Sequence, residues 1–244
     1  VTKPFLIMQL RPEDAAADDE LRAILEYGGI ALDEIERARL ETEGLPDIDL
    51  DAFSAIIVGG SPLDVSTPEN DKSDIQKKIE AGFMTLFDRI VDADFPFLGA
   101  CSGNGLLGKY CGASISSRYS EPVGGANITL TDAGRSDPLL KGFPETFRVL
   151  LGHKEACDDV PPSSVLLASS DTCPVQMFRL GQNIYATQFH PEADFKGFTI
   201  RINVYRNHGY FPPETAEQLK TQIAGEETPY PKLMLKRFVN RYRR

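Results

Sequence analysis

The 244-residue chain lacks several features that define specialised classes of protein. No apolar stretch approaches the roughly 18–20 uninterrupted residues of a membrane-spanning helix, so we expect no membrane span. Basic residues are in deficit, because 26 Lys and Arg stand against 36 Asp and Glu and give a formal net charge of −10. This balance disfavours nucleic-acid partners, whose phosphates need Lys and Arg. The N-terminal segment has neither the basic start nor the cleavage site of a signal peptide, which predicts a cytoplasmic protein.

Metal-binding and disulfide patterns are also missing. The cysteines lie far apart with no C-x-x-C pair, and none has zinc-finger spacing with a histidine; the residues concerned are Cys101, Cys111, Cys157, Cys173, His153, His190 and His208. Without a signal peptide, such cysteines are interpreted as reduced thiols. We therefore predict no metal and no cofactor. One cysteine and one histidine can instead serve nucleophilic catalysis.

The first 120 residues alternate between apolar runs and helix-forming segments. The apolar runs are residues 5–9, 53–58 and 95–100, and the helix-forming segments are residues 12–27 and 71–91. Residues 30–37 alternate as a further strand would, with a helix as the alternative. Such β-α-β alternation is typical of a parallel sheet with helices on both faces. We predict an α/β fold with an open, mostly parallel sheet flanked by helices.

The second half is richer in strands. Short apolar segments separated by Gly, Pro, Asp and Asn predict antiparallel strands at residues 126–130, 147–151, 165–169, 175–179 and 183–189. Residues 196–209 and 231–244 are predicted to be helical. No linker or composition break divides the chain, so we predict one domain over residues 1–244 with a C-terminal helical extension at about 196–244.

Cys101 lies at the end of an apolar strand, between Gly99 and Gly103, and a helix-forming segment follows. Glycines beside a nucleophile allow the sharp strand-to-helix turn without a Cβ clash. The positive end of the helix dipole would favour a thiolate. The Ser102 amide would then face an oxyanion beside the sulfur. The alternative is a buried cysteine whose neighbouring glycines serve packing.

Two histidines compete as the partner of this cysteine. His190 ends an apolar run and Glu192 follows two positions later, as the third member of a triad would. His153 and Glu155 have the same spacing after another apolar run. We favour His190, although the residues alone leave His153 open. Gly60, in the turn Gly59-Gly60-Ser61-Pro62, is a candidate for the second oxyanion donor.

These elements, in this order, resemble the class I glutamine amidotransferases over roughly residues 4 to 195. The matching segments are Leu98–Gly103 around the nucleophile, Ala186–Glu192 around the histidine and Ile56–Gly60 at the oxyanion strand. The resemblance implies a flavodoxin-like fold and a Cys101–His190–Glu192 triad that hydrolyses glutamine through a cysteinyl thioester. Gly60 and Ser102 would bind the oxyanion. Gly59, Asn104, Gly105, His153 and Gln188 would contribute to substrate binding, with His153 at the rim of the site.

One position departs from the family pattern. Gly105 stands where the family usually has a glutamine that binds substrate, and Asn104 precedes it. Three hypotheses follow. The chain is a glutaminase that supplies a separate synthetase subunit with ammonia, a stand-alone hydrolase of γ-glutamyl peptides or amines, or a non-catalytic binding module on the same fold. The ligand in each case is glutamine or another γ-glutamyl small molecule.

Overall fold

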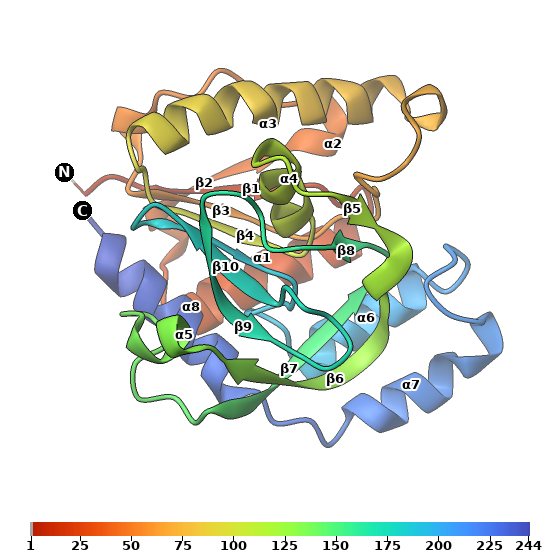
Figure 1. The fold of residues 1–244 in the computed structure, drawn as a ribbon. Coiled ribbons are helices and arrows are strands. Elements are labelled where there is room, and N and C mark those ends of the chain that lie inside the picture. The colour runs from red at the N-terminus through yellow and green to blue at the C-terminus, as the bar shows by residue number, and fades with distance from the viewer. Residues whose placement is uncertain (1) are drawn as a thin grey trace.

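A computed structural model describes residues 2–244, and one nine-stranded sheet runs through both halves of the chain (Figure 1). The strand order is β2-β1-β3-β4-β11-β10-β9-β6-β7. The strands are β1 (Phe5–Gln9), β2 (Ile35–Arg39), β3 (Ala55–Val58), β4 (Phe97–Ala100), β6 (Glu121–Leu130), β7 (Thr146–His153), β9 (Ser164–Ser169), β10 (Met177–Leu180) and β11 (Ile184–Thr187). A small second sheet pairs β5 (Ile115–Ser116) with β8 (Ala156–Cys157).

The sheet is parallel from β2 to β11 and antiparallel from β11 to β7. This arrangement confirms the predicted α/β fold with antiparallel strands in its second half. In the centre of the sheet, β11 pairs with β4 in a register that places Thr187 opposite Ala100. The segments that follow these two residues therefore leave the sheet at the same edge, and they carry Cys101 and His190.

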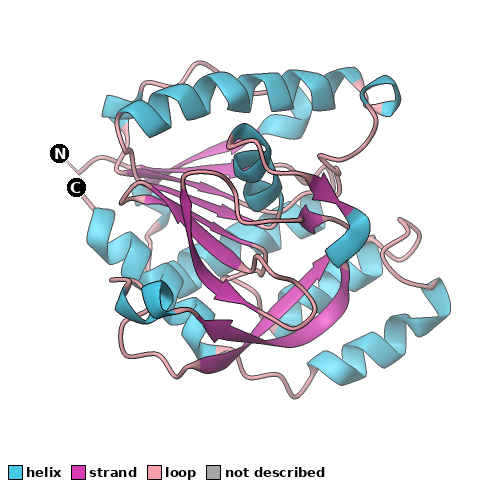
Figure 2. Ribbon diagram, in the orientation of Figure 1, coloured by secondary structure: helices cyan, strands magenta, loops and turns pink. Residues whose placement is uncertain are grey.

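Helices pack on both faces of the nine-stranded sheet (Figure 2). They are α1 (Asp14–Gly28), α2 (Leu40–Glu43), α3 (Asp74–Asp92), α4 (Ser102–Tyr110), α5 (Asp132–Ser136), α6 (Phe195–Val204), α7 (Ala216–Ile223) and α8 (Pro229–Tyr242). The helix predicted for residues 196–209 ends at Val204, and turns follow to residue 209. Helix α7 was not predicted. It packs against α6 and β6 and belongs to the C-terminal extension.

The apolar runs are continuous because the parallel strands are buried on both sides. Along β1, Leu6 and Met8 belong to the core that includes Phe83 and Phe87 of α3. The alternate residues of β1 face the core that includes the apolar side of α8. Figure 1 shows α3 along one face of the sheet, with α1 and α8 on the other.

The C-terminal helix ends beside the N-terminus of the chain (Figure 1). Helix α8 packs along α1 and contributes Met234, Leu235, Phe238 and Val239 to the core. The Lys3 amide donates a hydrogen bond to the Arg244 carbonyl at 2.8 Å. The basic C-terminal segment is thus a docked helix. Within the described residues, no helix is both long enough and apolar enough to span a membrane.

Candidate active site

The nucleophile turn has the geometry that its glycines predict. Cys101 has φ 53° and ψ −91°, which is rare for a residue with a side chain and costs on the order of 1–3 kcal/mol. Its amide donates a hydrogen bond to the Thr187 carbonyl at 2.7 Å. A β-carbon on Gly99 would lie 2.8 Å from the Gly103 α-carbon, so position 99 requires glycine. A β-carbon on Gly103 would make only an ordinary contact with Val58 at 3.6 Å.

The Cys101 thiol is neutral in this environment. Burial raises the pKa of the Cys101 thiol to about 12, although the charges of Arg11 and Arg201 act in the opposite direction. Desolvation of the sulfur therefore outweighs the nearby positive charges of the two arginines. A base must remove the thiol proton before the sulfur can attack a carbonyl.

His190 and Glu192 form a hydrogen-bonded pair at the end of β11. His190 Nδ1 lies 3.0 Å from Glu192 Oε1, and both side chains are buried. Burial lowers the pKa of His190, and the charge of Glu192 only partly opposes this effect. The carboxylate of Glu192 accepts from Nδ1, which leaves Nε2 of the neutral imidazole free to take a proton.

Glu192 remains ionised although it is buried. Burial opposes ionisation of the carboxyl, but the interactions with His190 and with the charged Arg201 outweigh burial and lower the pKa of Glu192. Arg201 Nη2 donates to Glu192 Oε1 at 2.7 Å, and its guanidinium also lies over the Phe198 ring. The Glu192 carboxylate is therefore fixed by a cation from α6.

A second buried ion pair continues this network. Arg11 Nε donates to Glu20 Oε2 at 2.7 Å, and Arg201 Nη2 lies 3.7 Å from the same oxygen. Arg11 Nη1 also donates to the Tyr205 hydroxyl at 3.2 Å. Two guanidiniums and two carboxylates thus extend from β1 and α1 to the triad. Sequence reasoning missed this network, although Arg11 follows a strand at the same carboxyl edge as Cys101.

The amide of Gly60, the predicted oxyanion donor, already has a hydrogen-bond partner in this structure. It donates a hydrogen bond to Glu20 Oε2 at 3.1 Å. A β-carbon on Gly59 would lie 2.2 Å from the other Glu20 oxygen, so the carboxylate rests directly against the glycine turn. An oxyanion can use the Gly60 amide only after Glu20 releases it. Gly59 itself donates its amide to the Met8 carbonyl at 3.0 Å.

His153 has a different set of partners from His190. Its Nε2 lies 2.8 Å from Glu121 Oε2, and its Nδ1 lies 3.0 Å from the Glu155 carbonyl oxygen. The Glu155 carboxylate accepts hydrogen bonds from the Val65 and Ser66 amides instead, so His153 and Glu155 do not form a triad-like pair. His153 also belongs to a cluster of three side chains that could hold a metal ion, with Glu121 and Cys173. Their ligand atoms all lie within 4.8 Å of one another, and no other such group of three occurs among the described residues.

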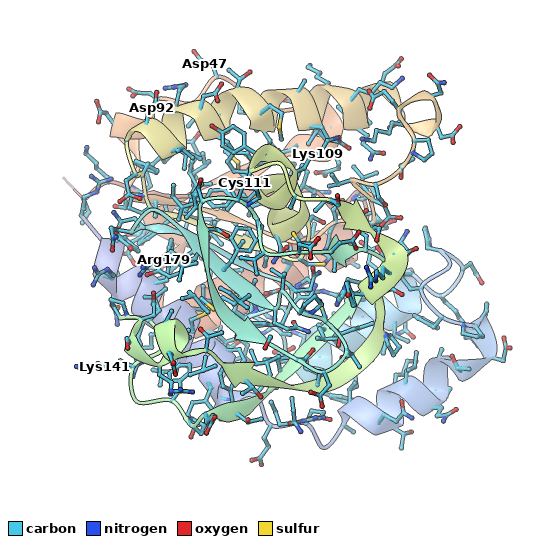
Figure 3. All side chains as sticks on the ribbon, in the orientation of Figure 1. Asp47, Asp92, Lys109, Cys111, Lys141 and Arg179 are labelled. Carbon is cyan, nitrogen blue, oxygen red and sulfur yellow. The ribbon has the colours of Figure 1, made fainter. Side chains whose placement is uncertain are left out.

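The predicted substrate residues separate into two groups. Asn104 is fully buried and accepts a hydrogen bond from the Cys157 thiol at 3.4 Å. The Asn104 side chain therefore meets β8 through Cys157, and its role in substrate binding stays a prediction. Gly105 and Gln188 lie beside the nucleophile, and Gln188 Nε2 is 4.0 Å from Cys101 Sγ. The half-buried Cys111 lies at the other end of α4 (Figure 3).

Two pockets meet at Cys101. The first, here called the His190 pocket, has about 430 Å³ including its open mouth, and its lining includes Arg11, Cys101, His190, Phe198, Arg201 and Tyr205. The second, here called the Gly105 pocket, has about 330 Å³ on the same measure, and its lining includes Cys101, Ser102, Gly105, His153, Glu155 and Gln188. Ser61, Gly152 and Tyr210 line both, and the Tyr210 hydroxyl donates to the Ser61 carbonyl at 3.3 Å.

Comparison with known proteins places this site in a family. The family model described as "Glutamine amidotransferase class-I" matches residues 23–206, well over half of the chain. The chain therefore belongs to the class I glutamine amidotransferase family, in agreement with its fold. A relative in Pyrococcus abyssi, named as one subunit of a glutamine-hydrolyzing GMP synthase, is 28% identical over 62% of this chain and 73% of its own length.

Other relatives are matched over shorter shares of their length. The match covers 56% of the corresponding GMP synthase subunit from Pyrococcus furiosus, at 32% identity over 44% of this chain. It covers only 23% of the GMP synthase of Petrotoga mobilis, at 32% identity over 48% of this chain. A solved structure of a glutamine amidotransferase from Thermotoga maritima has a TM-score of 0.70 and 20% identity, with 97% of this chain and 98% of that chain covered. A glutamine amidotransferase structure from Methylobacillus flagellatus has a TM-score of 0.72 at 16% identity, covering 100% and 97%.

Proposed function

We propose that this protein is a cysteine amidase that hydrolyses the side-chain amide of glutamine through a thioester on Cys101 and releases ammonia. The observation that carries the proposal is that the half-buried Cys101 and the buried His190 line one pocket. Cys101 and His190 line the same cavity, and Glu192 holds the imidazole from behind. Membership of the class I glutamine amidotransferase family supports the same chemistry.

In the acylation step, the neutral His190 imidazole takes the proton of the Cys101 thiol as the sulfur attacks the amide carbon. The histidine then donates this proton to the departing nitrogen, so ammonia leaves and a glutamyl thioester remains. Water attacks the thioester with His190 again as the base, which yields glutamate and restores the thiol. Glu192 stabilises the imidazolium that forms in each step.

The oxyanion of each tetrahedral intermediate needs donors beside the sulfur. The Ser102 amide is the first amide of α4, and such amides have no partner within their own helix. The second donor would be the Gly60 amide, which must first exchange Glu20 for the oxyanion. Each well-placed donor of this kind contributes about 3–4 kcal/mol to transition-state stabilisation.

The test is release of ammonia from glutamine by the purified protein, with the Cys101→Ala and Cys111→Ala variants assayed in parallel. We expect Cys101→Ala to abolish turnover and Cys111→Ala to retain it, because only Cys101 lines the pockets. Labelling of Cys101 by the glutamine analogue diazo-oxonorleucine would identify the nucleophile directly. If Cys101 is neither labelled nor required, the chain is a non-catalytic binding module and the proposal fails.

The names of two relatives support a destination for the ammonia. Because both are named as subunits of a GMP synthase, we include in the proposal a cytoplasmic complex with a separate synthetase subunit. Ammonia release would then be weak in isolation and would rise when the partner is added. Glutaminase activity that is unchanged by every candidate synthetase would contradict this part of the proposal only.

A second candidate function is hydrolysis of γ-glutamyl peptides or amines without a partner. Gly105 favours it, because it removes the side chain with which the family usually contacts glutamine. A β-carbon there would make only ordinary contacts, 3.4 Å from Val65 and 3.6 Å from Glu155. The space beside Glu155 is therefore left open. Turnover of γ-glutamyl peptides that exceeds turnover of glutamine would favour this candidate.

A further inference from the structure

Cys101 lines both pockets, but the other groups of the proposed reaction are divided between them. His190 lines one pocket and is absent from the lining of the other, while Ser102 and Gly105 line only the second. The general acid must reach the departing nitrogen, so the leaving group lies on the side of His190. The glutamyl part then lies in the Gly105 pocket. Ammonia as the leaving group would leave almost all of the His190 pocket unused.

The His190 pocket contains cationic donors beyond those that hold the triad. Arg201 is 8% exposed, and its Nη1 is buried with no hydrogen-bond partner among residues 2–244. A buried guanidinium nitrogen without a partner carries a desolvation cost that a ligand oxygen would remove. The hydrogen bonds of Arg11 within the described chain use its Nε and Nη1. Its Nη2 would be 2.4 Å from a β-carbon on Gly60, and His190 Cε1 would be 2.7 Å from the same atom.

The rest of this pocket is apolar or aromatic. Val123, Phe198, Ile202 and Phe211 line it together with the arginines. Phe198 and Ile202 come from α6, and Phe211 follows the turns after that helix. The walls therefore come largely from the C-terminal extension, beyond the triad motif. A pocket with apolar walls and two free guanidinium nitrogens suits a small group that has both a carboxylate and an apolar side chain.

We infer that the His190 pocket is a leaving-group subsite for an α-amino acid, and that the substrates include γ-glutamyl amides of apolar amino acids. The inference deepens the proposed function and rests on it. The carboxylate of the leaving amino acid would accept hydrogen bonds from Arg11 and Arg201. Its side chain would lie against Phe198 and Phe211.

The chemistry is the same acyl transfer with a larger leaving group. Cys101 Sγ forms a bond to the γ-carbonyl carbon, the carbon–nitrogen bond breaks, and His190 Nε2 donates a proton to the nitrogen. The free amino acid leaves. Water then cleaves the thioester to give glutamate and the thiol, so the net reaction consumes one water and yields glutamate and one amino acid.

A matched pair of substrates isolates the carboxylate. γ-Glutamyl-phenylalanine and γ-glutamyl-phenethylamide differ only in that group, and glutamine serves as the substrate with the smallest leaving group. We expect kcat/KM for γ-glutamyl-phenylalanine to exceed that for the phenethylamide by about tenfold or more, as a charge-assisted hydrogen bond would give. The Cys101→Ala variant measures the background for each substrate.

Arginine variants separate a specific contact from a structural role. Arg201→Lys and Arg11→Lys retain the positive charge but lose guanidinium donors, and Arg206→Lys, whose Nε donates to the Pro213 carbonyl, is the control. A disturbed triad would slow both substrates equally. We expect the ratio between them to fall towards one in the two pocket variants and to stay unchanged in Arg206→Lys.

The outcomes distinguish this inference from the proposed function. Turnover of glutamine with equal kcat/KM for both amides, or a ratio that neither arginine variant changes, overturns the leaving-group subsite and leaves the amidase intact. Turnover of glutamine without any turnover of γ-glutamyl-phenylalanine has the same meaning. If no γ-glutamyl compound reacts at Cys101, the proposed function fails and this inference fails with it.

Discussion

Glu192 Oε1 accepts hydrogen bonds from two groups at once, His190 Nδ1 at 3.0 Å and Arg201 Nη2 at 2.7 Å. The carboxylate therefore orients the imidazole and is itself held by a cation from α6. Because all three side chains are buried, water cannot take the place of a lost hydrogen bond between them. His190 and Glu192 are thus linked by hydrogen bonds to Arg201 of the C-terminal extension.

From this arrangement we predict that turnover requires the charge of Glu192. We expect Glu192→Gln to lower kcat for glutamine by about 100- to 10,000-fold, because a neutral amide no longer stabilises the imidazolium. The measurement is steady-state ammonia release, with circular dichroism to establish that the variant is folded. Glu217→Gln, at an exposed position in α7, is the matched control. A loss no larger than that of the control would show that Glu192 does not act in the reaction.

The lowered pKa of His190 predicts that kcat/KM stays high to a more acidic pH than an ordinary histidine would allow. The histidine acts as a base only when neutral, and burial lowers its pKa, so the neutral form persists to more acidic pH than for a free imidazole. We expect the acid limb of kcat/KM to fall below the ordinary value of about 6.5. A limb above that value would mean that the charge of Glu192 outweighs burial.

The raised pKa of Cys101 predicts slow alkylation of the resting protein. At neutral pH the thiol is protonated, and only the thiolate reacts with iodoacetamide. We expect the rate at Cys101, followed by mass spectrometry, to rise with pH through the alkaline range without a plateau, since the pKa is about 12. A plateau already at neutral pH would indicate a preformed thiolate–imidazolium pair.

Glu20 is expected to be important for folding. It is fully buried, and it pairs with Arg11 while it accepts from the Gly60 amide. Removing its charge leaves a buried guanidinium uncompensated, so we expect Glu20→Gln to lower the free energy of unfolding by about 3–5 kcal/mol. Urea denaturation measures this, with Glu69→Gln, whose carboxylate is exposed, as the control. Equal stability of the two variants would contradict the buried network.

Substitutions of Gly99 in β4 and Gly105 in α4 are expected to have opposite effects on stability. Gly99→Ala places a β-carbon against the Gly103 backbone and should destabilise the fold by about 1–3 kcal/mol or more. Gly105→Ala makes only ordinary contacts within a helix, so it should stabilise the fold by up to about 1 kcal/mol. Thermal and urea unfolding of both variants test the pair. The reverse order would show that the turn around Cys101 differs from the one described.

The fold could be predicted where local patterns are strong. The apolar runs of β1, β3 and β4 and the amphipathic segment of α3 are properties of neighbouring residues, so their periodicity and flanking glycines locate them. The strand predicted at residues 30–37 lies at 35–39, because a short helical turn precedes it. The short α7 escaped prediction, since its burial depends on packing against β6 and α6.

The sequence by itself determined where the turn at Cys101 lies, and it narrowed the candidates for the general base to His153 and His190. The steric limit on Gly99 and the change from strand to helix at Cys101 involve only neighbouring residues. Both can therefore be predicted without a structure. The tertiary structure decided the rest. Arg11 meets Tyr205 across 194 positions of sequence, and Glu20 reaches the Gly60 amide across 40. Such contacts, and the pocket that they build beside His190, depend on how distant strands and helices pack, which no local pattern encodes.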